Sequence, residues 1–186
     1  MIRTKIFILL TALSVIFFAC TSPYKNKVQE VDNWIEKVTV KNQKLRALDS
    51  AKVKEIGVEY AKNIVLLRSK LESYTFDSID QEMSNTIQQY KGLKKGTARF
   101  PMTYSNLKRE SEYTLKQLND LRAVLSAGKI EGKKLDEKLA EKYFNDEKNA
   151  VNLLLTQITE TISLYESILA THDTLTPKVK TYLEKL

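Results

Sequence analysis

The chain has 186 residues, with 30 Lys and Arg against 23 Asp and Glu, one cysteine and one histidine. A single cysteine excludes a disulfide scaffold and cysteine-based zinc or iron–sulfur clusters, and a single histidine excludes metal sites built from several histidines. Only five glycines and three prolines occur, which favours helices over a β-sandwich and over disorder. A chain of this length suits one domain with a substantial core.

The N-terminus has the pattern of a secretory signal. Arg3 and Lys5 precede residues 6–19, which are apolar apart from Thr11 and Ser14. A helix of this length spans about 21 Å, which is less than the hydrocarbon core of a bilayer at about 30 Å. A basic start, a short apolar stretch and a small residue together indicate a cleaved signal peptide rather than a membrane-spanning anchor.

The residues around the cleavage site, Phe17-Phe18-Ala19-Cys20, place a small residue directly before the only cysteine. This arrangement resembles the signal of bacterial lipoproteins, and the resemblance covers about the first twenty residues. It implies that residues 1–19 are removed, that Cys20 carries acyl chains, and that the membrane is a partner through this anchor. The alternative is an ordinary signal peptide that leaves a free thiol on Cys20. Two or three acyl chains hold a protein firmly on a membrane, whereas one does so only marginally.

The residues after the cysteine predict the location of the protein. The first acidic residue is Glu30, and by resemblance to lipoprotein sorting this favours an outer-membrane protein that faces the periplasm. Removal of residues 1–19 leaves 28 basic and 23 acidic residues, a mild excess of +5. Because the protein is expected outside the cytoplasm, nucleic acid is not an expected partner.

Apolar residues recur every three or four positions through the rest of the chain, which is typical of helices with one buried face. We expect residues 20–27 to form the acylated cysteine and a tether. Residues 28–186 are predicted to form a single all-α domain, an antiparallel bundle of four or five helices. The stripes in residues 28–45 and 53–74 are out of phase across residues 48–50. The sequence slightly favours a hairpin there over one long helix with a stutter.

The middle of the chain contains several helix boundary signals. Ser78 and Gln81 have the spacing of a capping box, before a helix that is expected to end at Gly92. A basic loop should follow, with Pro101 opening the next helix. Gly128 is expected to be the C-cap of that helix.

The C-terminal third is predicted to contain the longest helix, over about residues 135–172. Thr176-Pro177 has the pattern of an N-cap followed by proline at the first helical position, so a short final helix is expected after it. No segment alternates apolar and polar residues, and therefore no strand is expected.

Candidate catalytic groups are few. His172 is the only imidazole and is followed by Asp173, but no serine or threonine lies in a recognisable nucleophile motif. The chain contains neither an HExxH pair nor the Glu-x-x-His of di-iron bundles. We therefore expect no catalytic residue, no metal site and no cofactor, and we interpret His172 as a histidine near a helix end.

Two further sets of residues are candidate binding sites. Four cations, Lys91, Lys94, Lys95 and Arg99, occur without an intervening acid and could bind an anionic lipid headgroup or a cell-wall polymer. The alternative is helix termination, in which lysines lie near the last carbonyl groups of a helix. A similar basic loop occurs over residues 128–134.

Tyrosines on the expected inner faces form the second candidate set. Tyr60, Tyr90 and Tyr165 could line a ligand pocket, or could pack their rings in the core with the hydroxyl at its edge. Trp34 could pack in the core or contact the membrane surface.

These observations favour a non-enzymatic, lipid-anchored envelope protein that binds a protein partner through its helical bundle. One alternative is a carrier of a small apolar ligand or lipid in a tyrosine-lined cavity. Another is a periplasmic inhibitor or immunity-type protein. An exposed apolar groove would favour the first hypothesis, and a large dry cavity would favour the carrier.

Overall fold

The computed structural model describes residues 23–72 and 81–186. These residues form five helices and two very short strands, which confirms the expected all-α, single-domain bundle. In chain order the elements are α2 (Lys25–Arg46), α3 (Ser50–Glu72), α4 (Gln81–Tyr90), α5 (Leu93–Ala127), β1 (Lys129–Ile130), β2 (Lys133–Lys134) and α6 (Glu137–Lys185). Within the described ranges, no helix combines the length and the hydropathy needed to cross a bilayer. The expected signal peptide, Cys20 and the capping residue Ser78 lie outside these ranges.

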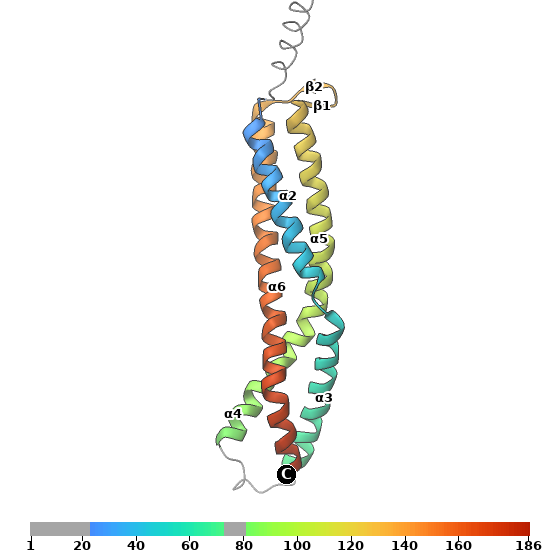
Figure 1. The fold of residues 1–186 in the computed structure, drawn as a ribbon, viewed down its shortest axis with the longest axis vertical. Helices are drawn as coiled ribbons and strands as arrows, with labels where there is room; N and C mark the ends of the chain where they lie inside the picture. Colours follow the sequence, from blue (N-terminus) through green and yellow to red (C-terminus); the bar gives the residue numbers. More distant parts are fainter. Residues whose placement is uncertain (1–22, 73–80) are drawn as a thin grey trace, which may run out of the picture.

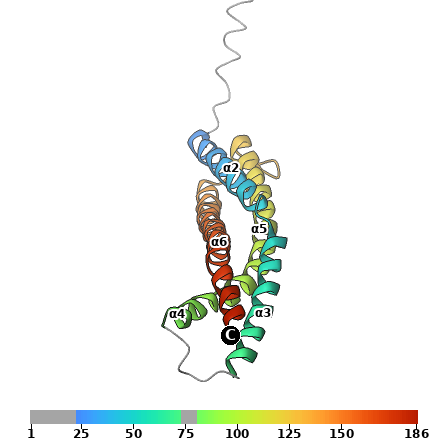
Figure 2. The ribbon, with the colours of Figure 1, turned by 60° about the horizontal axis from the view of Figure 1, so that its bottom comes forward.

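The helices form an elongated bundle (Figure 1). α2 and α3 follow one another along one side, and α5 and α6 each run along the length of the bundle. α5 runs antiparallel to α2, α3 and α6 and contacts all three. The 49 residues of α6 correspond to about 74 Å of helix. Figure 2 shows α4 on the opposite side of α6 from α3, at the end of the bundle far from the start of α2.

The expected hairpin between the first two helices is wrong, because α2 and α3 follow one another end to end (Figure 1). The chain leaves α2 at Ala47 and restarts at Ser50, where Asp49 Oδ1 accepts hydrogen bonds from the backbone N–H groups of Ala51 and Lys52, both at 3.0 Å. This carboxylate caps the start of α3. The phase shift between the two apolar stripes is therefore absorbed by a break without reversal of the chain. Each stripe packs against a different half of α5 and α6.

The interior is divided into two clusters along the bundle. The upper core joins α2, the C-terminal part of α5 and the first half of α6, whereas the lower core joins α3, α4, the start of α5 and the second half of α6. Trp34 belongs to the upper core, where its ring lies 4.8 Å from that of Phe144 and its side chain is only 8% exposed. Leu48 and Tyr104 pack against both clusters. Trp34 is therefore a core residue.

Two expected helix starts are wrong, since Pro101 lies inside α5 and Pro177 lies inside α6. A proline within a helix removes one backbone hydrogen bond. Burial of Phe100 before the first proline, and of Thr176 and Val179 around the second, keeps both helices continuous. The segment expected to be a basic loop is consequently the first two turns of α5.

The expectation of no strands is wrong at one turn. Lys129 pairs with Lys134 in an antiparallel ladder of two residues on each side. Glu131 and Gly132 both have positive φ, at 49° and 78°, as two-residue hairpin turns of the primed type require. Strands of this length are too short to show alternation in the sequence. The expected cap at Gly128 is confirmed, with a left-handed φ of 60°.

Candidate functional site

The four cations expected to bind an anion lie on the exposed surface around the start of α5, but they do not line one site. Lys91 lines a groove between α3 and α4, and Arg99 lines a cleft between α5 and α6. Lys94 and Lys95 line neither of these sites. The similar segment over residues 128–134 lies at the opposite end of the bundle (Figure 1). The two basic segments therefore cannot act together on one anion.

The three candidate pocket tyrosines are packing residues of the lower core. Tyr60 and Tyr90 are buried with their ring centroids 5.3 Å apart, and Asn63 Nδ2 donates a hydrogen bond to Tyr90 Oη at 3.0 Å. Burial raises the pKa of Tyr60, with a smaller contribution from Tyr90. Tyr165 packs its ring 5.6 Å from that of Phe100. These rings fill space between the helices, as the alternative interpretation proposed.

An open groove at the far end of the bundle brings apolar and basic side chains together. It has a volume of about 410 Å³ and lies between the C-terminal part of α3 and the end of α4. We call it the far-end groove, and its lining residues are Ile64, Leu67, Arg68, Leu71, Glu72, Ile87 and Lys91. Of these, sequence reasoning selected only Lys91, because the others look like ordinary core or surface positions of separate helices.

A second depression lies between α5 and α6, near the middle of the bundle. We call it the seam cleft; its volume is about 500 Å³ and its lining residues are Arg99, Thr103, Asn106, Leu107, Gln157, Glu160, Thr161 and Leu164. Most of these side chains are polar. Sequence reasoning selected only Arg99, since the two sides of the cleft are separated by about fifty residues and no local motif connects them.

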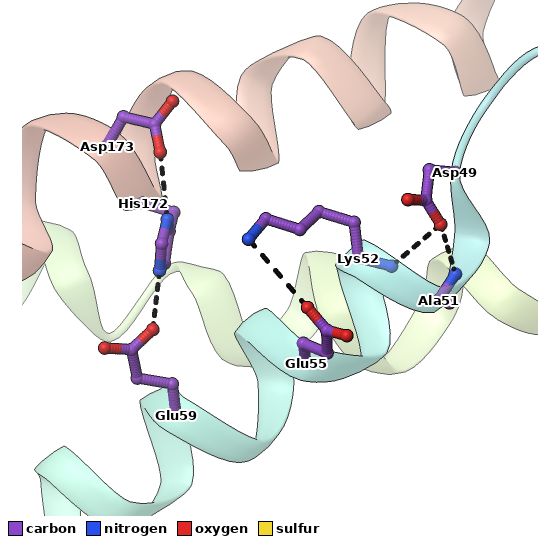
Figure 3. Close-up of polar contacts among 7 residues, drawn as sticks. All are labelled: Asp49, Ala51, Lys52, Glu55, Glu59, His172 and Asp173. Atoms are coloured by element: carbon purple, nitrogen blue, oxygen red, sulfur yellow. Dashed lines mark hydrogen bonds and ion pairs between the residues drawn. The ribbon is translucent and has the colours of Figure 1, made fainter.

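The only histidine takes part in a charged network between α3 and α6 (Figure 3). His172 Nε2 lies 2.9 Å from Glu59 Oε2 and Nδ1 lies 3.0 Å from Asp173 Oδ1, while Lys180 Nζ lies 2.7 Å from Glu59 Oε1. The hydrogen bond from Lys180, followed by that from His172, lowers the pKa of Glu59, and Glu59 in turn raises the pKa of Lys180. Both ring nitrogens face carboxylates, so neither is directed at a hydroxyl nucleophile. The arrangement is that of a bridge between helices.

Metal-binding side chains do not cluster in the part of the chain that the structure describes: no group of three His, Cys, Asp or Glu could hold an ion there. No protein-family model, no curated protein and no solved structure matches the chain. The functional interpretation therefore depends on the geometry of the far-end groove and the seam cleft.

Proposed function

We propose that this chain is a non-enzymatic lipoprotein that is anchored by Cys20 and binds a protein partner of the cell envelope at the far-end groove. The observation that supports this proposal is the position of the groove, at the opposite end of the bundle from the start of α2 (Figure 1). α2 begins at Lys25, only five residues after Cys20, and five residues reach at most about 17 Å. The length of α6 alone is about 74 Å.

This separation gives the two ends of the bundle different roles. The acylated end stays close to the membrane surface, and the far-end groove is presented away from it. Confinement to a surface raises the effective concentration of the protein toward a partner in the same envelope, so a contact of modest affinity is sufficient. On the expected outer-membrane location, the groove would face the periplasm.

The lining of the groove indicates the chemistry of the partner. Its apolar residues, Ile64, Leu67, Leu71 and Ile87, can accept aliphatic side chains, and Arg68 and Lys91 add two positive charges against the single acid Glu72. An amphipathic helix that lays its apolar face into such a groove is a common mode of peptide recognition. We therefore propose as the partner an amphipathic helix whose apolar face is bordered by acidic residues.

The carrier hypothesis uses the same groove in a different way. A volume of about 410 Å³ lies within the range of small-molecule sites, about 300–1,000 Å³, so an acyl chain could occupy it. The tyrosine-lined cavity of that hypothesis is replaced by packed rings at Tyr60 and Tyr90. An inhibitor or immunity-type protein is a special case of the docking proposal, in which the partner is a hydrolase or a toxin.

Photo-crosslinking in cells tests the docking proposal. A photoreactive amino acid at Lys91, in the groove, should give a discrete protein adduct, whereas the same amino acid at the exposed Lys138, at the anchored end of α6, should not. Arg68→Glu should reduce the Lys91 adduct because it reverses a charge that attracts an acidic partner, and the exposed Lys62→Glu of the same helix should not. Equal adducts at both positions, or no adduct at Lys91, would overturn the proposal, and a lipid adduct at Lys91 would favour the carrier.

A further inference from the structure

The seam cleft holds two opposite charges that do not pair with each other. Arg99 comes from α5 and Glu160 from α6, and both are exposed side chains that line the cleft. No ion pair to either side chain occurs in the described part of the chain. The cleft therefore offers one cation and one anion to a ligand.

The two walls of the cleft are stripes of side chains on antiparallel helices. Arg99, Thr103 and Asn106 follow one another at spacings of four and three residues, which places them on one face of α5. They span about 10 Å along the helix axis. Gln157 and Glu160, three residues apart on α6, form the facing wall together with Leu164.

The base of the cleft is formed by Leu107 and Thr161, which are only 5% and 3% exposed. The volume of about 500 Å³ is suitable for a ligand of two or three amino-acid residues, because small-molecule sites have volumes of about 300–1,000 Å³. The cleft is distinct from the far-end groove in position and in chemistry, and the inference does not depend on the proposed docking function.

The polar groups match a peptide better than they match other ligands. The primary amide of Gln157 can donate and accept hydrogen bonds, as a peptide group requires. Asn106 Oδ1 already accepts a hydrogen bond from Arg109 Nη2 at 2.7 Å, so this side chain offers chiefly its N–H donors. The Arg99 guanidinium can bind a carboxylate through two parallel hydrogen bonds, and Glu160 can accept hydrogen bonds from an ammonium group. A neutral sugar would leave both charges unpaired, an acyl chain would bury polar walls without partners, and a polyanion would be repelled by Glu160.

We propose that the seam cleft binds a short peptide with a free amino terminus and a free carboxyl terminus. Arg99 binds the terminal carboxylate and Glu160 binds the terminal ammonium group. Thr103, which follows Arg99 on the α5 wall and donates its own hydroxyl hydrogen to the Arg99 carbonyl, can accept a hydrogen bond from the peptide N–H. Two sources could supply such a ligand, namely the degradation of proteins, which yields L residues, and the turnover of envelope polymers that contain D residues. The stereochemistry of the preferred ligand distinguishes these sources.

The test uses the full-length protein in detergent solution and alanyl-alanine as the probe, in its L,L and D,D forms. Calorimetric titration and ligand-observed NMR should show saturable binding of at least one form, with a dissociation constant of about 1 mM or lower. Acetylation of the amino terminus, or amidation of the carboxyl terminus, should each weaken binding about tenfold or more, because each removes one charge-assisted hydrogen bond. Absence of saturable binding by both forms, or equal binding of the blocked derivatives, would overturn the proposal.

Single variants assign the two charges. Arg99→Gln should weaken binding of free alanyl-alanine about tenfold and have little effect on binding of the amidated derivative. Glu160→Gln should also weaken binding of free alanyl-alanine about tenfold, and should have little effect on binding of the acetylated derivative. The matched controls are Lys116→Gln on α5 and Glu166→Gln on α6, which are exposed and do not line the cleft. If the controls weaken binding as much as the cleft variants do, the cleft is not the site. Cys20→Ala should leave these affinities unchanged, so the outcome is separable from that of the anchor and docking experiments.

Discussion

Glu59 in α3 accepts a hydrogen bond from His172 in α6 at 2.9 Å, and this pair connects two helices that are more than one hundred residues apart in the sequence. The second ring nitrogen of His172 faces Asp173, and the other oxygen of Glu59 faces Lys180. Both contacts of the imidazole are hydrogen bonds only when both ring nitrogens carry hydrogen. The network holds the lower half of α3 against α6, next to the far-end groove.

Replacement of Glu59 by Gln should lower the free energy of unfolding at pH 7 by about 1 kcal/mol or less, because exposed ion pairs contribute little individually. The folded-state pKa of Glu59 is lowered from its ordinary value of 4.5, mainly by Lys180 and then by His172. A lowered carboxyl pKa adds stability above the unfolded pKa, and this stability is lost as the pH falls through the folded pKa. Urea unfolding of the wild type and Glu59→Gln should therefore converge below pH 4.5, and a difference that persists at low pH would contradict this assignment.

Replacement of Glu147 by Gln should raise, rather than lower, the free energy of unfolding at pH 7. Glu147 lies between Phe144 and Val151 on the inner side of α6, and its Oε2 is buried without a hydrogen-bond partner. Burial, with a smaller contribution from Asp146, raises the pKa of Glu147. When folding raises the pKa of a carboxyl group, that group makes the folded state more stable below the unfolded pKa than at neutral pH. This additional stability is lost as the pH rises through the folded pKa.

The Glu147→Gln variant should therefore be more stable than the wild type at pH 7, by less than about 1 kcal/mol because solvent screens a half-buried carboxylate, and equal to it at about pH 3. The measurement is urea unfolding at the two pH values, with Glu166→Gln, an exposed position of the same helix, as the control. If Glu147→Gln instead lowers the stability at neutral pH, the carboxylate makes a favourable contact in solution.

Gly96 marks a close approach of α5 to α6. A Cβ at this position would lie 3.0 Å from Ile168 Cγ1, and Ile168 is itself buried. Helix propensity alone predicts that Gly96→Ala stabilises α5 by about 0.5–1 kcal/mol. Because the buried side chain cannot move freely, we expect a net destabilisation of about 1–2 kcal/mol instead.

A lower thermal midpoint of Gly96→Ala, with a smaller drop when the same substitution is made in an Ile168→Ala background that lacks Cγ1, would confirm this close contact. A higher midpoint would show that α5 and α6 can separate slightly without cost.

The apolar stripes predicted the helices well where packing and periodicity agree. Val53, Ile56, Tyr60 and Leu67 were placed on one inner face, and all four are buried. The boundaries at the two prolines could not be predicted in the same way, because local rules place proline at a helix start, whereas tertiary packing on both sides kept these helices continuous. The break at residues 48–50 was visible as a change of phase, but the direction of the chain after it depends on which half of α5 and α6 each stripe contacts.

The candidate sites were less accessible to sequence reasoning than the fold. The four basic residues around the start of α5 looked like one anion site, but a helical rather than a loop conformation distributes them over different faces, so Lys91 and Arg99 line separate depressions. The partners of Arg99 across the seam cleft, Gln157 and Glu160, carry no motif of their own. A binding wall composed of two distant helices becomes visible only when the packing of those helices is known.

Trp34 provides an intrinsic probe of the upper core, because it is the only tryptophan in the chain. Its ring packs against Phe144 and is shielded from water, so its emission should be blue-shifted and poorly quenched by acrylamide. Addition of anionic lipid vesicles should leave both properties unchanged, since a core position keeps the ring away from the membrane surface. Trp34→Ala should cost about 3–5 kcal/mol of unfolding free energy, as truncations of large buried side chains do. A vesicle-dependent change in emission would contradict this placement.

Native mass spectrometry of the full-length protein, extracted gently from its own membranes, tests the proposed anchored docking function most directly. It reports the mass at the N-terminus and any retained protein in one experiment. We expect residues 20–186 with acyl chains on Cys20, together with a co-purifying protein that is retained by Lys62→Glu and lost in Arg68→Glu. An unmodified Cys20, or an intact chain that still carries residues 1–19, would contradict the anchor, and a partner retained by Arg68→Glu would contradict the groove.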